Sequence, residues 1–241
     1  MCSINHDKKA LFIHIPKNGG SYIAEILSKH YGFKNYYLQR PDHSTFCFGK
    51  DSSVDKHENK IHGTLVYYKS SPHINQIMNM NEDKWNNYYI FTFIRNPYDR
   101  IISGWNYINK YNLSFKNYLN SYLENNLEIN AYDYWHVFMT QTRHIINTNG
   151  KIRCDYIAKF ENMEHELKII LNHLDFKDIF HVPYKKNSKK HEKYDLYYDE
   201  KTYEEVKILM KEDFDNFEKN IKEHENVKIL IKEDFDNFEK I

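Results

Sequence analysis

Three short runs rich in apolar residues, each followed by a stretch with helical periodicity, dominate the pattern of this chain. The runs are Leu11 to Ile15, Tyr88 to Ile94 and Asp155 to Phe160. Their β-branched and aromatic content is typical of parallel strands, which are covered on both faces and therefore carry few polar residues. Strands that alternate with helices in this way predict an α/β domain.

Helices are predicted where apolar residues recur every three or four positions. One begins near Ser21. Another begins at Asn96-Pro97, where Asn is a good N-cap and Pro suits the first helical position. In full, the predicted helices cover residues 21–30, 72–80, 97–108, 115–125, 132–140, 162–174 and 199–219.

The remaining segments are predicted to be mostly irregular. Residues 31–60 are polar with scattered aromatic side chains and read as loop, while residues 65–69 begin either a short strand or a helix. Near the C-terminus, VKILMKEDFDNFEK from Val206 recurs as VKILIKEDFDNFEK from Val227. Two copies are too few for a solenoid, which needs three or more units. We therefore expect one domain over 1–220 and a duplicated C-terminal helix as an appendage over 221–241.

Composition narrows the possible function classes. Lys plus Arg and Asp plus Glu number 34 each, so bulk charge gives no reason to expect nucleic acid or a membrane surface as partner. The three cysteines, Cys2, Cys47 and Cys154, lie far apart without CxxC spacing. This pattern favours a reducing compartment and no metal site of the zinc type. With no leader-like or membrane-spanning apolar run in the sequence, we expect a soluble cytoplasmic protein.

The chemistry of the chain is expected to centre on residues 11–22, LFIHIPKNGGSY. The first strand stops at Pro16, passes through Lys17-Asn18-Gly19-Gly20 and continues as a helix from Ser21. A strand, a glycine turn and a helix start together point several backbone N–H groups and a helix dipole at one spot, which suits a phosphate. The glycines let the backbone approach an anion, and Lys17 adds a positive charge. We interpret this stretch as a cradle for a nucleotide phosphate; the alternative is a purely structural corner.

The order of residues in the cradle argues against an ordinary P-loop NTPase. A Walker A loop reads GxxxxGK[ST], with the lysine after the glycines and a hydroxyl group that holds magnesium. Here Lys17 precedes both glycines, and GK[ST] occurs nowhere in the chain. A P-loop-type kinase is therefore disfavoured.

A second constellation, FTFIRNPYDRIISGW, follows from Phe91. Arg95 comes directly after the second strand and is expected at the carboxyl edge of the sheet, where ligands collect in open α/β folds. Ser103 lies two turns or so into the next helix, at ~3.6 residues per turn. Arg can bind phosphate with two hydrogen bonds and Ser can donate one, so the pair suits a second phosphate group. Arg100 is either a further ligand or a structural ion-pair partner of Asp99 or another acid.

These two segments, in this order, resemble the donor-binding motifs of the sulfotransferases. FIHIPKNGGSY is similar to FIHIPKTGGTS of the carbohydrate-type branch, which includes the heparan sulfate 2-O- and 6-O-sulfotransferases, and the segment from Phe91 resembles FxFVRxPxxRxxSxY. The resemblance covers about residues 11–217. Weaker likenesses are Asn187-Ser188 in a lysine-rich loop, Tyr197-Tyr198-Asp199, the helix end Asp213 to Phe217, and a DxIxxFENL-like stretch from Asp155.

The resemblance implies a three-layer α/β sandwich with a P-loop-like cradle and a central parallel sheet of about four or five strands. It implies 3′-phosphoadenosine 5′-phosphosulfate (PAPS) as co-substrate, no metal, and a hydroxyl-bearing acceptor, with a glycan as the first expectation. Tyr22 stands where the family has a small hydroxyl residue, so only its backbone is expected to bind phosphate. The implied donor-binding residues are Lys17, Asn18, Gly19, Gly20, Ser21, Tyr22, Arg95, Ser103 and Ser188.

Sulfuryl transfer needs a general base on the acceptor hydroxyl, and His is the side chain best poised near neutral pH. His62 lies between the two donor motifs, where the family's catalytic histidine lies, and is the expected base. Lys17 is the second expected catalytic residue, because it stabilises the leaving phosphate. His14, inside the first strand, is interpreted as a core or supporting residue. The alternatives for the base are His43, His57, His73, Glu58 and Asp42.

The main prediction is thus a PAPS-dependent sulfotransferase that uses no nucleic acid and spans no membrane. Two alternatives stay open at this stage. One is a P-loop-type kinase or another nucleotide-phosphate enzyme, and the other is a non-catalytic carbohydrate- or nucleotide-binding protein on the same fold. The identity of the acceptor and the oligomeric state are left open.

Overall fold

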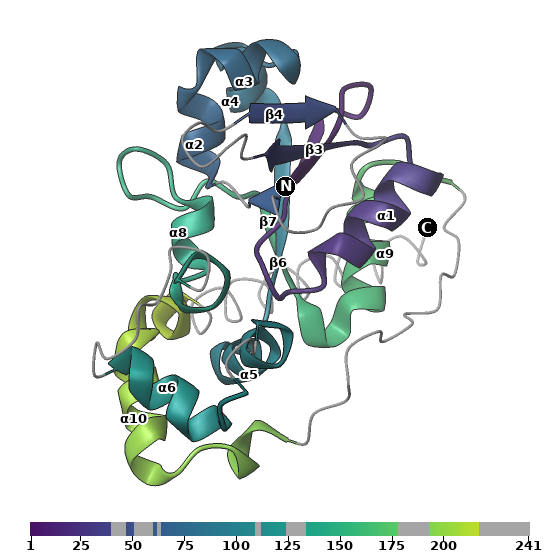
Figure 1. Cartoon of the computed structure of the whole chain (residues 1–241). Coiled ribbons are helices and arrows are strands. Elements are labelled where there is room, and N and C mark those ends of the chain that lie inside the picture. Colours follow the sequence, from purple (N-terminus) through teal and green to yellow (C-terminus); the bar gives the residue numbers. More distant parts are fainter. Residues whose placement is uncertain are drawn as a thin grey trace, which may run out of the picture.

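The computed structural model describes residues 1–39, 47–50, 60–61, 64–108, 112–123, 134–177 and 193–216. A seven-stranded sheet with the order β4-β3-β1-β2-β6-β7, to which β5 adds through β3, forms the centre of this part of the chain (Figure 1). The strands are β1 (Cys2–Asn5), β2 (Ala10–Ile13), β3 (Lys34–Gln39), β4 (Cys47–Lys50), β5 (Lys60–Ile61), β6 (Tyr89–Ile94) and β7 (Tyr156–Lys159).

The sheet is mixed. Strands β2, β6 and β7 run parallel, and they are the three strands that the apolar runs predict. β1 is antiparallel to both β2 and β3, and β3 is antiparallel to β4 and β5. The prediction of a parallel sheet of four or five strands is therefore wrong for the part of the sheet formed by β1, β3, β4 and β5. The prediction of loop over 31–60 is wrong at β3 and β4.

Helices cover both faces of the sheet (Figure 1). Successive residues of a strand point to opposite faces, so Leu11 packs on one side and Phe12 on the other. Phe12 lies in a cluster with Leu27 of α1 and Ile170 of α9. Leu11 lies in a cluster with residues of the three short helices before β6. The helices involved are α1 (Gly20–His30), α9 (Met163–His173), α2 (Leu65–Ser70), α3 (Pro72–Ile77) and α4 (Glu82–Asn87).

A third apolar cluster lies beyond the carboxyl ends of the parallel strands, where Figure 1 shows α5, α6 and α10 grouped together. Ile101, Val137 and Val206 are fully buried within it. Its elements are α5 (Pro97–Ile108), α6 (Phe115–Leu123), the π-helical η2 (Tyr134–Phe138), the 3₁₀ turn η4 (Tyr194–Leu196) and α10 (Glu200–Leu209).

Most predicted helices are confirmed within a few residues at each end. The start of α5 follows its predicted cap: Asn96 Oδ1 accepts the backbone N–H of Tyr98 at 2.9 Å, and Pro97 is the first helical residue. The predicted helix over 132–140 is a π-helical turn, and α4 is a helix that the pattern did not predict. The predicted helix over 199–219 is wrong in its extent, because α10 ends at Leu209 with Met210 as its C-cap, and residues 211–216 form a separate helical turn. Among the described helices, none combines the length and the hydropathy needed to cross a membrane.

Candidate anion-binding site

The loop between β2 and α1 has the backbone shape of an anion-binding nest. Lys17 and Gly19 both have left-handed backbone angles, with φ of 70° and 73°. Such a φ is uncommon for a residue other than glycine. Alternation of right- and left-handed residues turns successive N–H groups toward one point. Gly19 caps α1 without any side-chain hydrogen bond. In the first turn the Tyr22 N–H already donates to the Gly19 carbonyl at 3.1 Å, so a ligand would meet the N–H groups that precede Tyr22.

Packing, and not only ligand approach, requires the two glycines. A Cβ on Gly19 would lie 2.5 Å from Met163 Cε, and a Cβ on Gly20 would lie 2.0 Å from His14 Cδ2. The His14 ring is 3% exposed, and its burial, with neighbouring positive charges, holds its pKa well below the usual value. His14, which directly follows the last residue of β2, Ile13, is therefore a neutral packing residue beneath the loop.

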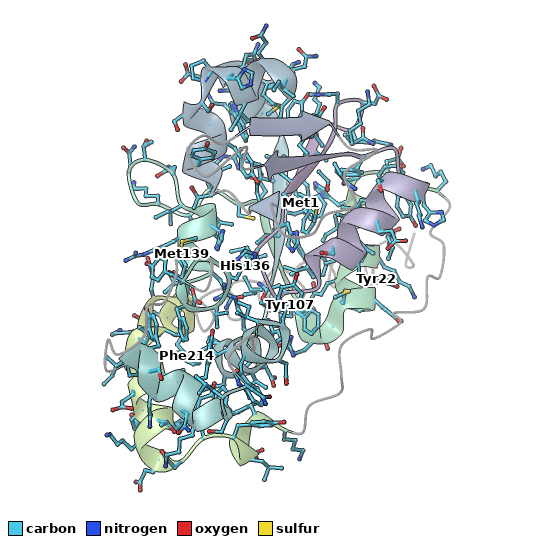
Figure 2. All side chains as sticks on the ribbon, viewed as in Figure 1. Met1, Tyr22, Tyr107, His136, Met139 and Phe214 are labelled. Carbon is cyan, nitrogen blue, oxygen red and sulfur yellow. The ribbon has the colours of Figure 1, made fainter. Side chains whose placement is uncertain are left out.

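The side chain of Lys17 lies against α5. Its Nζ is 3.8 Å from the centroid of the Tyr107 ring, and Figure 2 shows Tyr107 on this helix. Burial, and then the charges of Arg95 and Arg100, lower the pKa of Lys17 from 10.5 to about 7. The side chains of Lys17, Arg95 and Arg100 thus form a cationic centre beside the Tyr107 ring. A bound anion would stabilise these positive charges.

Arg95 lies beside the loop, as the second constellation predicts. β2 and β6 are parallel neighbours, with Ile13 opposite Thr92, so the residues that follow them meet at one edge of the sheet. Arg95 Nη1 donates to the carbonyl of Lys17 at 3.3 Å, and its guanidinium carbon lies 4.6 Å from the centroid of the Phe160 ring. The two segments that carry the sulfotransferase resemblance are therefore adjacent in space.

Arg100 supports the backbone. It is 1% exposed and donates to the carbonyl of Pro16 at 3.1 Å and to the carbonyls of Val137 at 3.2 Å and Met139 at 2.9 Å. The carbonyl of His136 lies 3.5 Å from Arg100 Nη2; Figure 2 labels His136 and Met139. Asp213 is the acid whose charge raises the pKa of Arg100, although burial lowers it overall to about 10. The structural role is thus favoured, with carbonyls in place of the expected carboxylate partner.

Ser103 is half-buried on α5. It lies three residues after Arg100, which reaches Pro16, and four residues before Tyr107, which contacts Lys17. Residues at these spacings share one face of a helix. Ser103 therefore belongs to the face of α5 that is turned toward the loop.

The other predicted loop residues differ in what they expose. Ser21 is exposed in the first turn of α1, whereas Tyr22 packs against the apolar cluster around Phe12. Asn18 is 1% exposed, and its Nδ2 donates to the carbonyl of Phe93 at 2.7 Å and to Gln141 Oε1 at 2.7 Å. Its Nδ2 is thus occupied within the protein, while its Oδ1 is buried without a hydrogen-bond partner among the described residues. With the side chain buried, a ligand would meet the backbone of Asn18.

Sequence reasoning missed Gln141 and Asp213, which lie directly behind this loop. Both are 1% exposed, and Gln141 Nε2 donates to Asp213 Oδ2 at 3.2 Å. No motif marks Gln141. Asp213 opens the DFDNF segment, which the sequence marked only as the end of a helix.

The expected base, His62, and the expected ligand Ser188 lie outside the described residues, as do the alternatives His43, His57, Glu58 and Asp42. His73 is exposed on α3. That helix bonds to α4 through Trp85 and Asn75, and α4 leads into the amino end of β6. His73 is thus at the opposite end of β6 from Arg95. In the described part of the chain, no group of three or more His, Cys, Asp or Glu side chains is placed to hold a metal ion.

Fold and site together define an α/β protein with a cationic loop, shaped like an anion-binding nest, at the carboxyl edge of its parallel strands. The family model described as the sulfotransferase family matches residues 2–220. The chain belongs to the sulfotransferase family, which supports sulfuryl transfer as its general activity. The same comparisons found no match among curated proteins or among solved structures.

Proposed function

We propose that this protein transfers the sulfuryl group of PAPS to a hydroxyl group, with a carbohydrate acceptor of the kind used by the heparan sulfate 2-O/6-O branch. The observation that carries the proposal is the contact between the Lys17 loop and the Arg95 side chain. It gives one site two sources of positive charge, as a donor with separate phosphate groups requires. On this proposal the helices on the two faces of the sheet form the family's three-layer, P-loop-like sandwich.

The proposed reaction is an in-line displacement. His62 removes the proton of the acceptor hydroxyl, the hydroxyl oxygen attacks sulfur, and the bond between sulfur and the bridging phosphate oxygen breaks. Adenosine 3′,5′-bisphosphate leaves, and the Lys17 ammonium and the backbone N–H groups of 18–21 stabilise the charge that develops on its phosphate. The Tyr22 N–H, which the sequence also suggested, donates to the Gly19 carbonyl instead. Arg95 and Ser103 hold the 3′-phosphate, and Ser188 adds a contact from its loop. No step needs a metal ion.

The donor half of the proposal is tested by calorimetric titration with adenosine 3′,5′-bisphosphate in the absence of metal. Arg95→Ala should weaken binding by about 100-fold, the usual cost of a lost bidentate ion pair in a partly buried site. Arg153→Ala is the matched control, because Arg153 pairs with Asp155 at 2.8 Å, ahead of the amino end of β7. Equal affinity in the wild type and Arg95→Ala would overturn the assignment. Tighter binding of ATP with magnesium would favour a kinase.

The acceptor half is tested by a transfer assay with labelled PAPS on a panel of glycan, lipid and phenolic acceptors. Label on glycans alone supports the proposed branch. In the same assay, His62→Ala should reduce turnover by at least about 100-fold, the usual contribution of a general base, while His73→Ala should not. Donor binding without transfer to any acceptor would instead indicate a non-catalytic binding protein.

A further inference from the structure

The side-chain amide of Gln141 uses all of its hydrogen-bonding positions. Oε1 accepts from Asn18 Nδ2 at 2.7 Å and from the backbone N–H of Arg95 at 2.9 Å. Nε2 donates to the carbonyl of Arg95 at 2.9 Å and to Asp213 Oδ2 at 3.2 Å. One buried amide therefore joins three parts of the chain: the loop between β2 and α1, called the phosphate loop below, the end of β6, and the C-terminal helical segment that carries Asp213.

Asp213 holds this amide from behind. Its Oδ2 accepts the backbone N–H of Gln141 at 2.9 Å, and its Oδ1 accepts the backbone N–H of Thr142 at 2.9 Å and Thr142 Oγ1 at 3.1 Å. The two backbone N–H groups and Gln141 Nε2 can only donate, whereas the Thr142 hydroxyl can donate or accept, so the arrangement suits the ionised carboxylate. Burial raises the pKa of Asp213, while Arg100 and these hydrogen bonds act against the rise.

The two residues that Gln141 joins belong to different parts of the proposed donor site. Asn18 lies between Lys17 and Gly19, which both have left-handed backbone angles, and its side chain bonds to Gln141 in this conformation of the loop. The backbone of Arg95 is bonded to the same amide on both its N–H and its carbonyl. A shift of Gln141 would therefore move both phosphate-binding elements relative to each other.

We propose that Gln141 and Asp213 are positioning residues that fix the distance between the phosphate loop and Arg95, so that both phosphates of the donor are bound at once. The identity of the ligand, a donor with two separate phosphate groups, rests on the proposed function. The hydrogen bonds of Gln141 and Asp213 do not depend on it. Neither residue is expected to contact the donor. Their effect comes through Asn18 and the Arg95 backbone, and a misplacement of about 1 Å in such a site can cost as much as 100-fold.

The test compares Gln141→Leu with Thr140→Val. Leucine nearly keeps the volume of Gln141 and removes all four side-chain bonds. Thr140→Val is the matched control, because Thr140 Oγ1 donates to Glu212 Oε2 at 2.6 Å. Thr140→Val thus removes a hydrogen bond between the segments that carry Gln141 and Asp213, and it leaves the bonds to the loop intact. Affinity for adenosine 3′,5′-bisphosphate is measured calorimetrically at a temperature where circular dichroism shows both variants folded.

We expect Gln141→Leu to weaken bisphosphate binding about 10- to 100-fold and Thr140→Val to leave it unchanged. Amide hydrogen exchange gives a readout without ligand: the peptide over residues 14–22 should exchange faster in Gln141→Leu and not in Thr140→Val. Wild-type affinity and wild-type exchange in Gln141→Leu would overturn the proposal, and so would equal losses in both variants.

Two further outcomes remain informative. If Gln141→Leu does not fold, Asn18→Ala replaces it. This change keeps Gln141 and removes the bonds of the loop to Gln141 and to the carbonyl of Phe93. It should give faster exchange over residues 14–22, and wild-type exchange would overturn the proposal. If the wild type binds no bisphosphate, the proposed function fails. The exchange experiment then still decides whether Gln141 holds the loop.

Discussion

Lys17 carries a positive charge at a place where the fold makes that charge unfavourable. Burial and two neighbouring guanidinium groups lower its pKa from 10.5 to about 7, and its backbone is in the left-handed region with φ of 70°. Unfavourable charge and backbone strain in one residue are typical of functional sites, where ligand binding rather than folding uses the group.

We predict that Lys17→Met stabilises the unliganded protein and abolishes bisphosphate binding. Folding lowers the pKa of Lys17, so the unfolded chain binds more protons than the folded chain between about pH 7 and pH 10.5. The charge on Lys17 therefore lowers the unfolding free energy of the wild type most at or below pH 7. This loss of stability disappears as the pH rises to 10.5. At pH 7 the gain in unfolding free energy should be about 1–2 kcal/mol, because partial solvation and the lost contact with Tyr107 reduce it.

Urea denaturation at pH 7 and pH 10 measures this gain. The difference between Lys17→Met and wild type should shrink at the higher pH. Lys29→Met is the control, since Lys29 is exposed and pairs with Glu25 on α1; its effect should stay within about 0.5 kcal/mol. A destabilised Lys17→Met protein at pH 7 would mean that the cationic centre does not oppose folding.

At the scale of elements, the junction of β2 and α1 depends on the fit between His14 and Gly20. A methyl group on Gly20 would meet the His14 ring at 2.0 Å. His14 is 3% exposed, and its ring is stacked with Phe12 at a centroid distance of 6.3 Å. The ring thus has little room to move. The helix start can keep its position only while residue 20 has no side chain.

We predict that Gly20→Ala costs about 3 kcal/mol of unfolding free energy through overpacking. In a His14→Ala background the same change should cost about 1–2 kcal/mol less, since the clashing ring is gone. Chemical denaturation of the four proteins gives this coupling energy. Gly150→Ala is the control: nothing lies within 4 Å of a Cβ there, so its effect should add independently to that of His14→Ala. Full additivity at Gly20 would show that the contact with His14 does not limit this position.

The elements that sequence reasoning found and those it missed differ in how they satisfy polar groups. β2 and β6 are apolar enough to be read directly from the chain. β3 has polar positions that look like loop, yet Asn35 is 7% exposed. It accepts from Ser3 Oγ at 2.6 Å and donates to the carbonyl of Ala24 at 3.2 Å. Such burial depends on partners distant in sequence, so no local pattern could reveal it.

The same distinction holds for the site. Lys17, the glycines and Arg95 form local motifs that follow strands, and the parallel pairing of β2 and β6 brings them together. Gln141 carries no motif, and its importance comes only from contacts with residues far away in the chain, such as Asn18 and Asp213. Local sequence therefore predicted which charged and glycine residues the fold brings together at this edge of the sheet, but not the residues that hold them in place.

At the scale of the whole molecule, the C-terminal segment closes the structure behind the site. Val206 and Met210 are fully buried in the third apolar cluster, and Asp213 bonds to the segment that carries Gln141 and Thr142. The first copy of the repeated sequence thus already supplies these buried contacts. The second copy repeats the same residue types, with Asp234 in the place of Asp213.

We predict that the domain is complete without the second copy. Deletion of 221–241 should change the unfolding free energy by less than about 0.5 kcal/mol and leave bisphosphate affinity unchanged. Asp213→Ala should lower the unfolding free energy by about 3–5 kcal/mol. It leaves four hydrogen-bond donors without an acceptor and removes the negative charge near Arg100. Asp234→Ala should have no effect. Denaturation of the full chain, the deletion and the two substitutions provides the comparison.

The double substitution Asp213→Ala/Asp234→Ala decides between two roles of the repeat. If the first copy alone fills this position, the double variant should behave as Asp213→Ala does. If the copies are interchangeable, Asp213→Ala alone would be mild, because the second copy would replace the first, and only the double variant or the combination with the deletion would be severe. The longer connection costs little, since loop-closure entropy rises by only about 0.6 kcal/mol for each doubling of length. A mild Asp213→Ala together with a severe double variant would therefore overturn the predicted boundary at residue 220 and make the repeat part of the support for the phosphate loop. Mild effects in both variants would mean that neither aspartate is needed for stability.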